Sequence, residues 1–469
     1  MKTQRARGIA LTLALLLLAA SARASDLSVD VTARRARLAS LLGARTALIL
    51  WSAPTRNYSG DVDYEYRQES NLYYLTGIAQ EETILVMLPG SDTPDVLFIK
   101  PHDPSKEHWF GRVLTPADAT ARSGVPTVMT IEQFAPFIDG LLSRGVVSRL
   151  ALLLPPPDAD RAPAAPTREE DFAKHAADAH PGLPAVDATP MLTSLRLVKT
   201  AYEQQLLVKC LQISSDAQKV GMRTARPDAF EYQVKAAIEG TYRGLGAASW
   251  AYPSIVGSGP NATILHYPDD DRQMKAGELL LVDAAANYQY IAGDITRTYP
   301  VGGTFTPAQK DIYAIVLAAQ DAGTEVARAG NTLATIHNKT VDVIKAGLLR
   351  LGLITDTKGD QYKIWYTHGA SHFIGVDVHD VGERGAVLEP GMAFTIEPGI
   401  YIRQSALDTL PETPDNAAFI AAVQPAVRKY LDIGVRVEDS FLLETGGPRR
   451  LSASVPRTIE DIEAFMRKR

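Results

Sequence analysis

The hydrophobic positions in the first part of the chain predict short strands that alternate with helices. Apolar runs bounded by polar or turn residues predict strands at 46–51, 73–77, 83–88, 96–100 and 149–154. Helical spacing of the apolar residues occurs at 29–42 and 131–142. Strands mixed with helices in this way predict an α/β domain of modest size. The Pro/Ala-rich run 155–167 that follows predicts a surface loop.

From about residue 197 the spacing becomes helical over longer segments. Helices are predicted at 202–226, 229–245, 306–329, 333–351 and after Thr458. Thr306-Pro307-Ala308-Gln309 has the sequence of a capping box with proline in the first helical turn. Strands are predicted at 250–256 and 278–298, and 367–443 is interpreted as strand and loop. Helices outside an antiparallel, half-buried sheet predict an α+β fold, with domains at 25–195 and 196–469.

The first 24 residues are typical of a secretory signal peptide. Lys2, Arg5 and Arg7 precede an apolar run, 8–20, and Ala22-Arg23-Ala24 fits a small-x-small cleavage site. The run is too short to span a bilayer stably. We therefore expect a secreted protein that begins near Ser25 and has no membrane partner after signal removal.

Charge and cysteine content narrow the classes of partner. The formal charge is −6 for the whole chain and −10 without residues 1–24, which carry four basic and no acidic residues. An acidic protein disfavours nucleic acids and anionic membranes, so we expect a small substrate that is neutral or cationic at one end. Cys210 is the only cysteine, which excludes an internal disulfide and disfavours thiolate chemistry. A single-cysteine exported protein fits a bacterial periplasm.

Asp283 and Asp294 mark the stretch with the clearest chemistry. An apolar run ends in Asp283, a polar patch follows, and a second extended segment carries Asp294, as in a β-hairpin. If the turn is centred between Tyr288 and Gln289, the aspartates face each other across the ladder, with Cβ atoms roughly 4.5–5.5 Å apart. Two like charges at that separation need a cation or a proton between them. The alternatives are two solvated carboxylates, or a bulge at Gly293 that turns Asp294 away.

Three clustered histidines form a second candidate group. His368, His372 and His379 lie within twelve positions of one another, and His266 lies farther upstream. The four-residue spacing of the first two is not that of a metalloprotease His-Glu helix, because no Glu follows His368 and Gly369 disfavours a helix.

Two glutamates lie in apolar, strand-like settings, where a carboxylate needs a partner. They are Glu397 and Glu438. Arg436 shares a strand face with Glu438, so a simple Arg–Glu surface pair is the alternative interpretation there. That alternative leaves Glu397 and the aspartates unexplained.

Together these groups give a candidate set of metal ligands: Asp283, Asp294, His372, Glu397 and Glu438. Four carboxylates balance two divalent cations, and oxygen ligands with one nitrogen suit Mn²⁺, with Zn²⁺ or Co²⁺ as alternatives. Two such ions about 3.5–4 Å apart can share a water, lower its pKa and deliver hydroxide to a carbonyl. Hydrolysis is therefore the expected reaction class.

Several motifs in a fixed order resemble one known family. In the second domain they are Leu265-His266-Tyr267, Val282-Asp283-Ala284, Gly293-Asp294-Ile295-Thr296, His368 to His372, His379-Asp380-Val381-Gly382, Glu397-Pro398-Gly399 and Arg436-Val437-Glu438. In the first domain they are residues 66–77 and Trp109-Phe110-Gly111-Arg112. This pattern resembles the creatinase-fold, or pita-bread, dinuclear metallopeptidases, specifically aminopeptidase P and its relative the Xaa-Pro dipeptidase.

The resemblance implies a C-terminal pita-bread catalytic domain, a smaller N-terminal α/β domain, and removal of the N-terminal residue from peptides with proline second. It implies that the five candidate ligands bind two metals, with Asp294 and Glu438 bridging. Glu397 would handle protons for the attacking water. His266 and His379 would stabilise the tetrahedral intermediate or carry a proton to the leaving nitrogen.

The resemblance also assigns residues around the ligands. His368 and, from a neighbouring subunit, Trp109 would shape the proline pocket, and a homo-oligomer (dimer or tetramer) is expected. Arg436 and Thr296 would contact ligand carboxylates. The loop after His379 is short, and only Arg384 could serve there as a substrate-positioning arginine. Residues 404–433 do not align with the family, which leaves the preferred peptide length open.

Three functional hypotheses follow. The favoured one is a secreted Xaa-Pro aminopeptidase acting on peptides of three residues or more, and the second is an Xaa-Pro dipeptidase. The third is a metal-free creatinase-fold member, either a binding protein or a hydrolase of creatine. It is disfavoured because all five ligand positions carry metal-binding side chains. A one-domain methionine aminopeptidase is disfavoured by the roughly 170 residues before the second domain.

Overall fold

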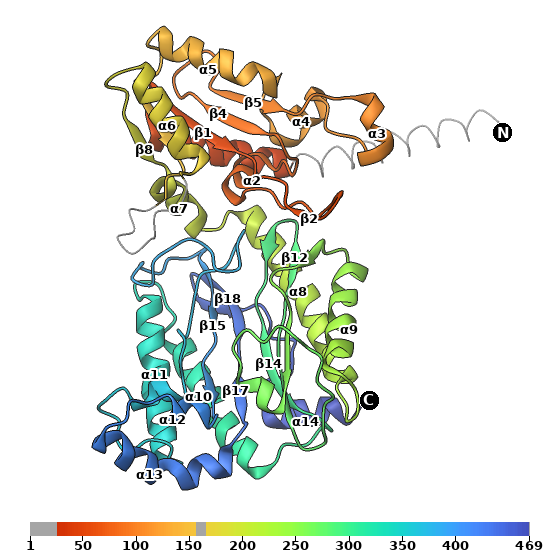
Figure 1. Ribbon diagram of the computed structural model, residues 1–469, viewed down its shortest axis with the longest axis vertical. Coiled ribbons are helices and arrows are strands. Elements are labelled where there is room, and N and C mark those ends of the chain that lie inside the picture. The colour runs from red at the N-terminus through yellow and green to blue at the C-terminus, as the bar shows by residue number, and fades with distance from the viewer. Residues whose placement is uncertain (1–25, 156–165, 469) are drawn as a thin grey trace, which may run out of the picture. The chain divides into compact units, whose positions relative to one another are not determined.

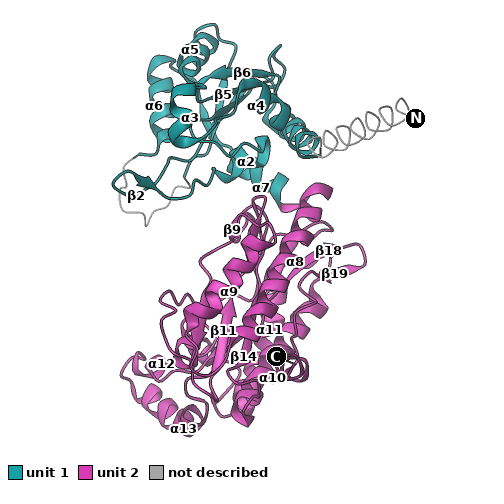
Figure 2. Ribbon diagram, turned by 90° about the vertical axis from the view of Figure 1, so that its right-hand side faces the viewer, with its two compact units in different colours: residues 1–196 teal, residues 197–469 magenta. Residues whose placement is uncertain are grey.

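The computed structural model describes residues 26–155 and 166–468, and the chain divides into two compact units, Met1–Arg196 (unit 1) and Leu197–Arg469 (unit 2) (Figure 1; Figure 2). The predicted signal peptide, 1–24, lies outside the described residues, so export stays a prediction. Among helices of the two described ranges, none has both the length and the apolar composition that a bilayer crossing requires.

Unit 1 is built on a mixed sheet with the strand order β6-β5-β4-β1-β7-β8. The pairs β1–β4 and β4–β5 are antiparallel, and β5–β6, β1–β7 and β7–β8 are parallel. A small hairpin, β2–β3, is separate from it. The strands are β1 (Thr46–Trp51), β2 (Asn57–Ser59), β3 (Val62–Asp63), β4 (Ile84–Met87), β5 (Asp95–Ile99), β6 (Thr127–Thr130), β7 (Arg149–Leu152) and β8 (Ala185–Asp187).

Helices of unit 1 pack on this sheet through aromatic side chains. Phe98 of β5 meets Phe134 and Phe137 edge-on, with ring centroids 5.5 and 5.4 Å apart. Residues 26–42 are helical, and the other helices are α2 (Ser70–Thr76), α3 (Pro104–Phe110), α4 (Pro116–Ser123), the short 3₁₀ helix η1 (Ile131–Gln133), α5 (Phe134–Ser143), α6 (Arg168–Ala179) and α7 (Thr189–Leu197). Unit 1 is thus the α/β domain that the sequence predicted.

The strand expected at 73–77 is wrong, because these residues form the last turns of α2. The Glu69 side chain accepts hydrogen bonds from the N–H groups of Asn71 and Leu72, and Gly77, at φ 66°, ends the helix. Every side chain from Leu72 to Thr76 is buried, so the apolar run shows no period that separates a strand from a buried helix.

Unit 2 contains long helices around several small sheets. The Thr306 capping box is confirmed, since its side chain accepts a hydrogen bond from the Gln309 N–H and Pro307 opens the helix. The helices are α8 (Ala201–Thr224), α9 (Glu231–Gly244), η2 (Gly259–Thr263), α10 (Pro307–Val326), α11 (Leu333–Arg350), η3 (Gln361–Ile364), α12 (Ser405–Asp408), α13 (Pro414–Tyr430) and α14 (Ile459–Met466). The interpretation of 367–443 as strand and loop missed α12 and α13.

The sheets of unit 2 have the orders β10-β11-β14, β13-β12-β9, β15-β18-β19 and β16-β17, and each pairing is antiparallel. The strands are β9 (Ser249–Trp250), β10 (Ile255–Ser258), β11 (Leu279–Asp283), β12 (Ala286–Tyr288), β13 (Ile291–Ala292), β14 (Thr296–Pro300), β15 (Ala393–Ile396), β16 (Gly399–Tyr401), β17 (Gly434–Arg436), β18 (Asp439–Glu444) and β19 (Gly447–Arg450). With its outer helices, unit 2 has the predicted α+β fold.

Two antiparallel ladders of unit 2 are each interrupted once. The pairing of β11 with β14 resumes as β12 with β13 in the same register, which leaves a first ladder gap at 284–285 and 293–295. The pairing of β15 with β18 resumes as β16 with β17, which leaves a second ladder gap at 397–398 and 437–438. The candidate acidic ligands lie at or inside these two gaps.

The register of the first hairpin differs from the expectation by two residues. Asp283 pairs with Thr296, and the turn lies at Gln289 and Tyr290, whose φ values of 50° and 66° suit a tight hairpin. Asp294 is therefore a diagonal neighbour of Asp283 and not its direct partner. Because side chains alternate with period 2, the two aspartates still share a face.

Candidate metal centre and active site

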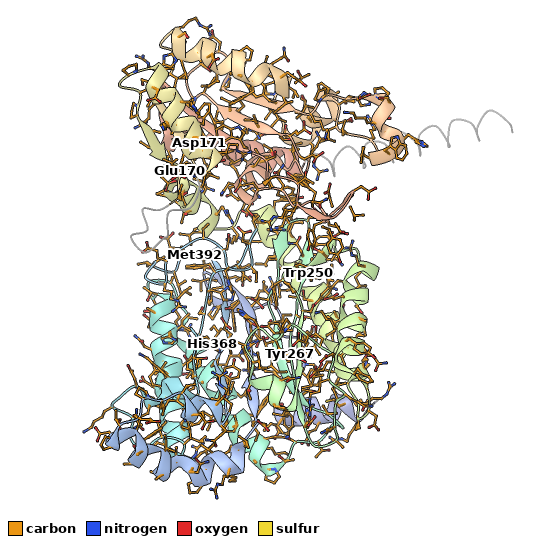
Figure 3. All side chains as sticks on the ribbon, viewed as in Figure 1. Glu170, Asp171, Trp250, Tyr267, His368 and Met392 are labelled. Carbon is orange, nitrogen blue, oxygen red and sulfur yellow. The ribbon has the colours of Figure 1, made fainter. Side chains whose placement is uncertain are left out.

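A cavity of about 830 Å³ brings the predicted site residues of unit 2 together, and every residue that lines it belongs to that unit. Its lining includes the five candidate ligands, Asp283, Asp294, His372, Glu397 and Glu438. It also includes His266, His368, His379, Arg384 and Arg436. Figure 3 labels two lining residues, His368 and Tyr267. A volume of this size suits a short peptide.

Asp283 ends β11, and Asp294 lies in the first ladder gap. The Tyr252 hydroxyl is 2.5 Å from Asp283 Oδ1 and 2.6 Å from Asp294 Oδ1. Because one hydroxyl has one proton, it can donate to only one carboxylate at a time. Gln218 of α8 donates to the carbonyls of Ala284 and Ile295, both at 3.0 Å, and so satisfies the backbone where the ladder is broken.

Glu397 and Glu438 are opposite one another in the second ladder gap. Gln320 of α10 donates to the carbonyls of Ile396 and Val437, at 3.0 and 3.1 Å, in the same manner as Gln218 at the first gap. Glu438 is 1% exposed, and its Oε2 accepts a hydrogen bond of 2.7 Å from the Thr296 hydroxyl. Its Oε1 is buried without a hydrogen-bond partner, which is costly for a carboxylate unless a cation meets it.

His372 turns a lone pair toward these carboxylates. Its Nδ1 lies 3.1 Å from the Phe373 carbonyl, which can only accept, so in the neutral ring Nδ1 carries the proton and Nε2 carries the lone pair. Nε2 lies 3.3 Å from Asp294 Oδ2, 3.5 Å from Glu397 Oε1 and 3.9 Å from Glu438 Oε1. A lone pair that faces three carboxylate oxygens is electrostatically unfavourable without a cation or a proton among them.

Burial shifts the titration of these acids upward. Burial and the neighbouring carboxylate of Asp283 raise the pKa of Asp294 well above its usual range, and burial with Asp294 does the same for Glu438. Burial raises the pKa of Glu397 to about 8. Cation binding must displace these protons, so we expect affinity for metal to fall as the pH falls.

The residues present fit divalent cations. Ligand atoms of Asp294, His372 and Glu438 all lie within 4.8 Å of one another. The set offers carboxylate oxygens and one imidazole nitrogen, and it includes an unpartnered buried oxygen and an unprotonated ring nitrogen that point at the others. Those features match the requirements of a divalent metal site.

A hydrogen-bond chain connects the ligands to His368. Arg436 donates through Nη2 to Asp283 Oδ2 at 2.6 Å and through Nη1 to the Tyr401 hydroxyl at 2.8 Å. The Tyr401 hydroxyl then lies 2.8 Å from His368 Nε2. Burial lowers the pKa of His368 to about 3, so its ring is neutral and can accept that proton. Arg436 Nε also donates to Thr296 Oγ1, which brings both expected ligand-contacting residues together.

The remaining predicted residues differ in their placement. His266 and His379 are exposed at the cavity wall, and the His379 ring centroid lies 4.4 Å from that of His372. The Arg384 guanidinium packs against Gly369, where an added Cβ would lie 2.5 Å from Nη2. Trp109 lies in unit 1 on α3, with 78% of its surface exposed. Its part in the proline pocket stays a prediction.

Sequence reasoning gave no role to Tyr252 or Tyr401. Tyr401 lies four residues after Glu397, just beyond the Glu397-Pro398-Gly399 motif, and only its position on β16 reveals the contact with Arg436. Tyr252 lies between β9 and β10 in a loop without charge or periodicity. Its role depends on the fold alone, so the sequence carried no signal for it.

Comparisons with known protein families match both units. Residues 205–445 match the family described as metallopeptidase family M24, and residues 31–147 match the aminopeptidase P, N-terminal domain. The chain is 34% identical over 443 residues to the Xaa-Pro aminopeptidase of Haemophilus influenzae, covering 92% of this chain and 96% of that protein.

Solved structures agree with these matches. Proline aminopeptidase P II from Yersinia pestis has a TM-score of 0.82 at 32% identity, covering 94% of this chain and 100% of that one. Aminopeptidase PepP of Pseudomonas aeruginosa has a TM-score of 0.82 at 35% identity, covering 94% and 98%. The similarity therefore extends over both units.

Proposed function

This chain belongs to metallopeptidase family M24, and from that membership we propose that it is an Xaa-Pro aminopeptidase, which removes the N-terminal residue from peptides with proline second. The observation that carries the proposal is the convergence of the Asp294, Glu397 and Glu438 carboxylates on Nε2 of His372, with Glu438 Oε1 buried and unpartnered. The dipeptidase alternative is not favoured, because the relatives that match nearly the whole chain are aminopeptidases.

We assign the cation site to Asp283, Asp294, His372, Glu397 and Glu438, with Mn²⁺ as the proposed metal. When bound, two cations lower the pKa of a water and polarise the scissile carbonyl. Arg436 holds Asp283, and Thr296 holds Glu438, so each partner fixes a ligand carboxylate in place.

Different residues of the cavity are proposed to carry out the two proton transfers of the reaction. Glu397 lines the cavity and accepts a proton as the oxygen of water bonds to the carbonyl carbon. The C–N bond to proline then breaks, and the prolyl nitrogen needs a proton to leave. His266 and His379 line the same cavity and are the groups proposed to stabilise the intermediate or deliver that proton.

Selectivity for proline follows from the missing N–H. A peptide bond to proline offers no donor and fixes φ, so a peptidase that grips the amide hydrogen cannot use it. His368 is kept neutral by burial, and the Gly369 carbonyl and the Tyr401 hydroxyl orient its ring. The ring lines the cavity and is proposed to contact the proline.

The substrate class is tested with three peptides on the Mn²⁺-loaded protein. We expect Xaa-Pro-Yaa to be cleaved at least about 100-fold faster, by kcat/KM, than Xaa-Ala-Yaa, a discrimination typical of a site built around one side-chain difference. Xaa-Pro should be cleaved poorly. Equal rates on the two tripeptides would refute proline selectivity, and cleavage of the dipeptide alone would restore the dipeptidase hypothesis. Release of the free N-terminal residue is followed by chromatography.

Arg384 is proposed to bind the carboxylate at the C-terminus of a tripeptide. None of the ion pairs of the described residues uses its guanidinium, which lines the cavity. Replacing Arg384 with Met should raise KM for Xaa-Pro-Yaa about tenfold, the effect of losing about 1.4 kcal/mol of binding free energy. The same variant should change KM for the C-terminal amide of that peptide less than twofold. An equal rise for both substrates would show that Arg384 does not bind the carboxylate.

A further inference from the structure

A buried ion pair lies beside the metal centre but contributes none of its candidate ligands. Lys199 Nζ is 2.7 Å from Asp380 Oδ2, and the side chains are 2% and 0% exposed. Two charges removed from water form a stable pair only where their geometry is good, and loss of one leaves the other uncompensated. The pair joins segments that are 181 residues apart in sequence.

Asp380 belongs to the loop that returns His379 to the side of His372. It follows His379 directly, and its N–H donates to the Phe373 carbonyl at 2.9 Å, next to His372. The loop contains no helix or long strand. Its shape therefore depends on individual contacts, and at its His379 end these include the Lys199–Asp380 ion pair, whose two charges are buried.

Lys199 itself is held on the other side. Its N–H donates to the Gly391 carbonyl at 2.9 Å, and Val198 bridges with Met392. Thr200 caps α8, since its side chain accepts a hydrogen bond from the Glu203 N–H. The backbone of Lys199 is thus held by contacts of the residues on either side of it, and its side chain extends from there to the loop.

Gly375 makes room for this pair. A Cβ added there would overlap the Asp380 carboxylate and lie 2.7 Å from Lys199 Nζ. The backbone of Gly375 is not in the left-handed region, so an alanine is excluded by the ion pair and not by its own φ. The single methyl group of an alanine at position 375 should therefore displace the Lys199–Asp380 ion pair.

We propose that Lys199 is a positioning residue for the reaction: through Asp380 it holds the loop that sets His379 beside His372. The inference rests on the proposed function, in which His379 acts on the substrate. Lys199 does not touch the substrate, and its effect passes through the loop.

Kinetics of Gly375→Ala, K199M and the double variant K199M/D380N test the proposal. We expect kcat for Xaa-Pro-Yaa to fall about 10- to 100-fold, as a misplacement of about 1 Å can cause. KM should stay within twofold, and the bound metal should stay constant. Gly385→Ala and Lys209→Met are matched controls, because an added Cβ at Gly385 meets nothing within 4 Å and Lys209 is exposed on α8.

The double variant separates positioning from stability. It removes both buried charges, so its Tm should recover relative to K199M while kcat stays low. Recovery of kcat together with Tm would overturn the proposal, as would a K199M variant with unchanged kcat. If K199M does not fold, Gly375→Ala and the double variant carry the same comparison.

A crystal structure of metal-loaded Gly375→Ala gives a readout that needs no activity. We expect the His379 ring to move away from its 4.4 Å separation from His372. An unchanged separation would overturn the proposal. A wild-type protein that fails to cleave Xaa-Pro-Yaa would instead overturn the proposed function, while this structural comparison would still decide the positioning.

Discussion

Replacing Glu397 with Gln is expected to leave the protein folded and metal-loaded while it lowers kcat by about 10²- to 10⁴-fold, the range for loss of a positioned general base. The amide keeps one oxygen that can face the site, and it removes the charge that crowds Glu438 and Asp294. It cannot accept the proton of an attacking water. Steady-state kinetics on Xaa-Pro-Yaa and metal analysis of the same sample measure both parts.

Glu444→Gln is the matched control for this variant. Glu444 ends β18 and is exposed, and its ion pair with Arg449 at 3.4 Å is a weak surface contact. Its kcat should be that of the wild type. Unchanged turnover in Glu397→Gln would remove Glu397 from its assigned role, and loss of metal from that variant would assign it to binding instead.

Asp294→Asn is expected to abolish activity by loss of metal and yet to stabilise the metal-free protein. A carboxylate ligand lost from the shared site should weaken cation binding by more than about 100-fold, the upper range for loss of an outer partner. The pKa of Asp294 is raised above its unfolded value, so the metal-free wild type loses stability as the pH rises through that folded-state pKa. Asparagine has no such proton to lose.

Metal analysis and thermal unfolding at neutral pH, with and without chelator, test the two effects of Asp294→Asn. Chelator should lower the Tm of the wild type and leave that of the variant unchanged. Without metal the variant should have the higher Tm, by roughly 2–4 °C for each kcal/mol gained. Asp408→Asn, at an exposed position on α12, is the control. A metal-free variant less stable than the metal-free wild type would contradict the idea that repulsion among buried carboxylates is relieved by cations.

Helices with strong terminal signals were predictable from sequence, and buried short segments were not. The capping box at Thr306 located the start of α10, because the box is formed by a side chain and a backbone N–H only three residues apart. In α2 the helix ends are marked by Glu69 and Gly77, which are less specific than a capping box. Because the residues between them are nearly all buried, the sequence shows no alternation of apolar and polar positions with helical spacing. Helix α13 carries an internal proline, Pro425, which argues against a helix in any sequence-based analysis.

The site was predictable as far as it depends on charge and on the alternation of side chains between the two faces of a strand. The expected register placed Asp283 opposite Asp294 and was wrong by two residues, but an even shift keeps side chains on the same face, whereas a shift of one would have separated them. The interruption of the ladder could not be foreseen. It depends on Gln218, which lies on a helix 65 residues upstream of Asp283 and reaches the broken backbone only in the folded state.

The two ladder gaps divide the negative charge of the site equally. One ladder supplies Asp283 and Asp294, and the other supplies Glu397 and Glu438, so neither ladder alone can neutralise two divalent ions. The ladders adjoin where the Glu438 N–H donates to the Thr296 carbonyl at 3.1 Å. Cations bound by ligands of both ladders would therefore cross-link the two ladders. The ions that serve the chemistry would in this way also stabilise the catalytic unit.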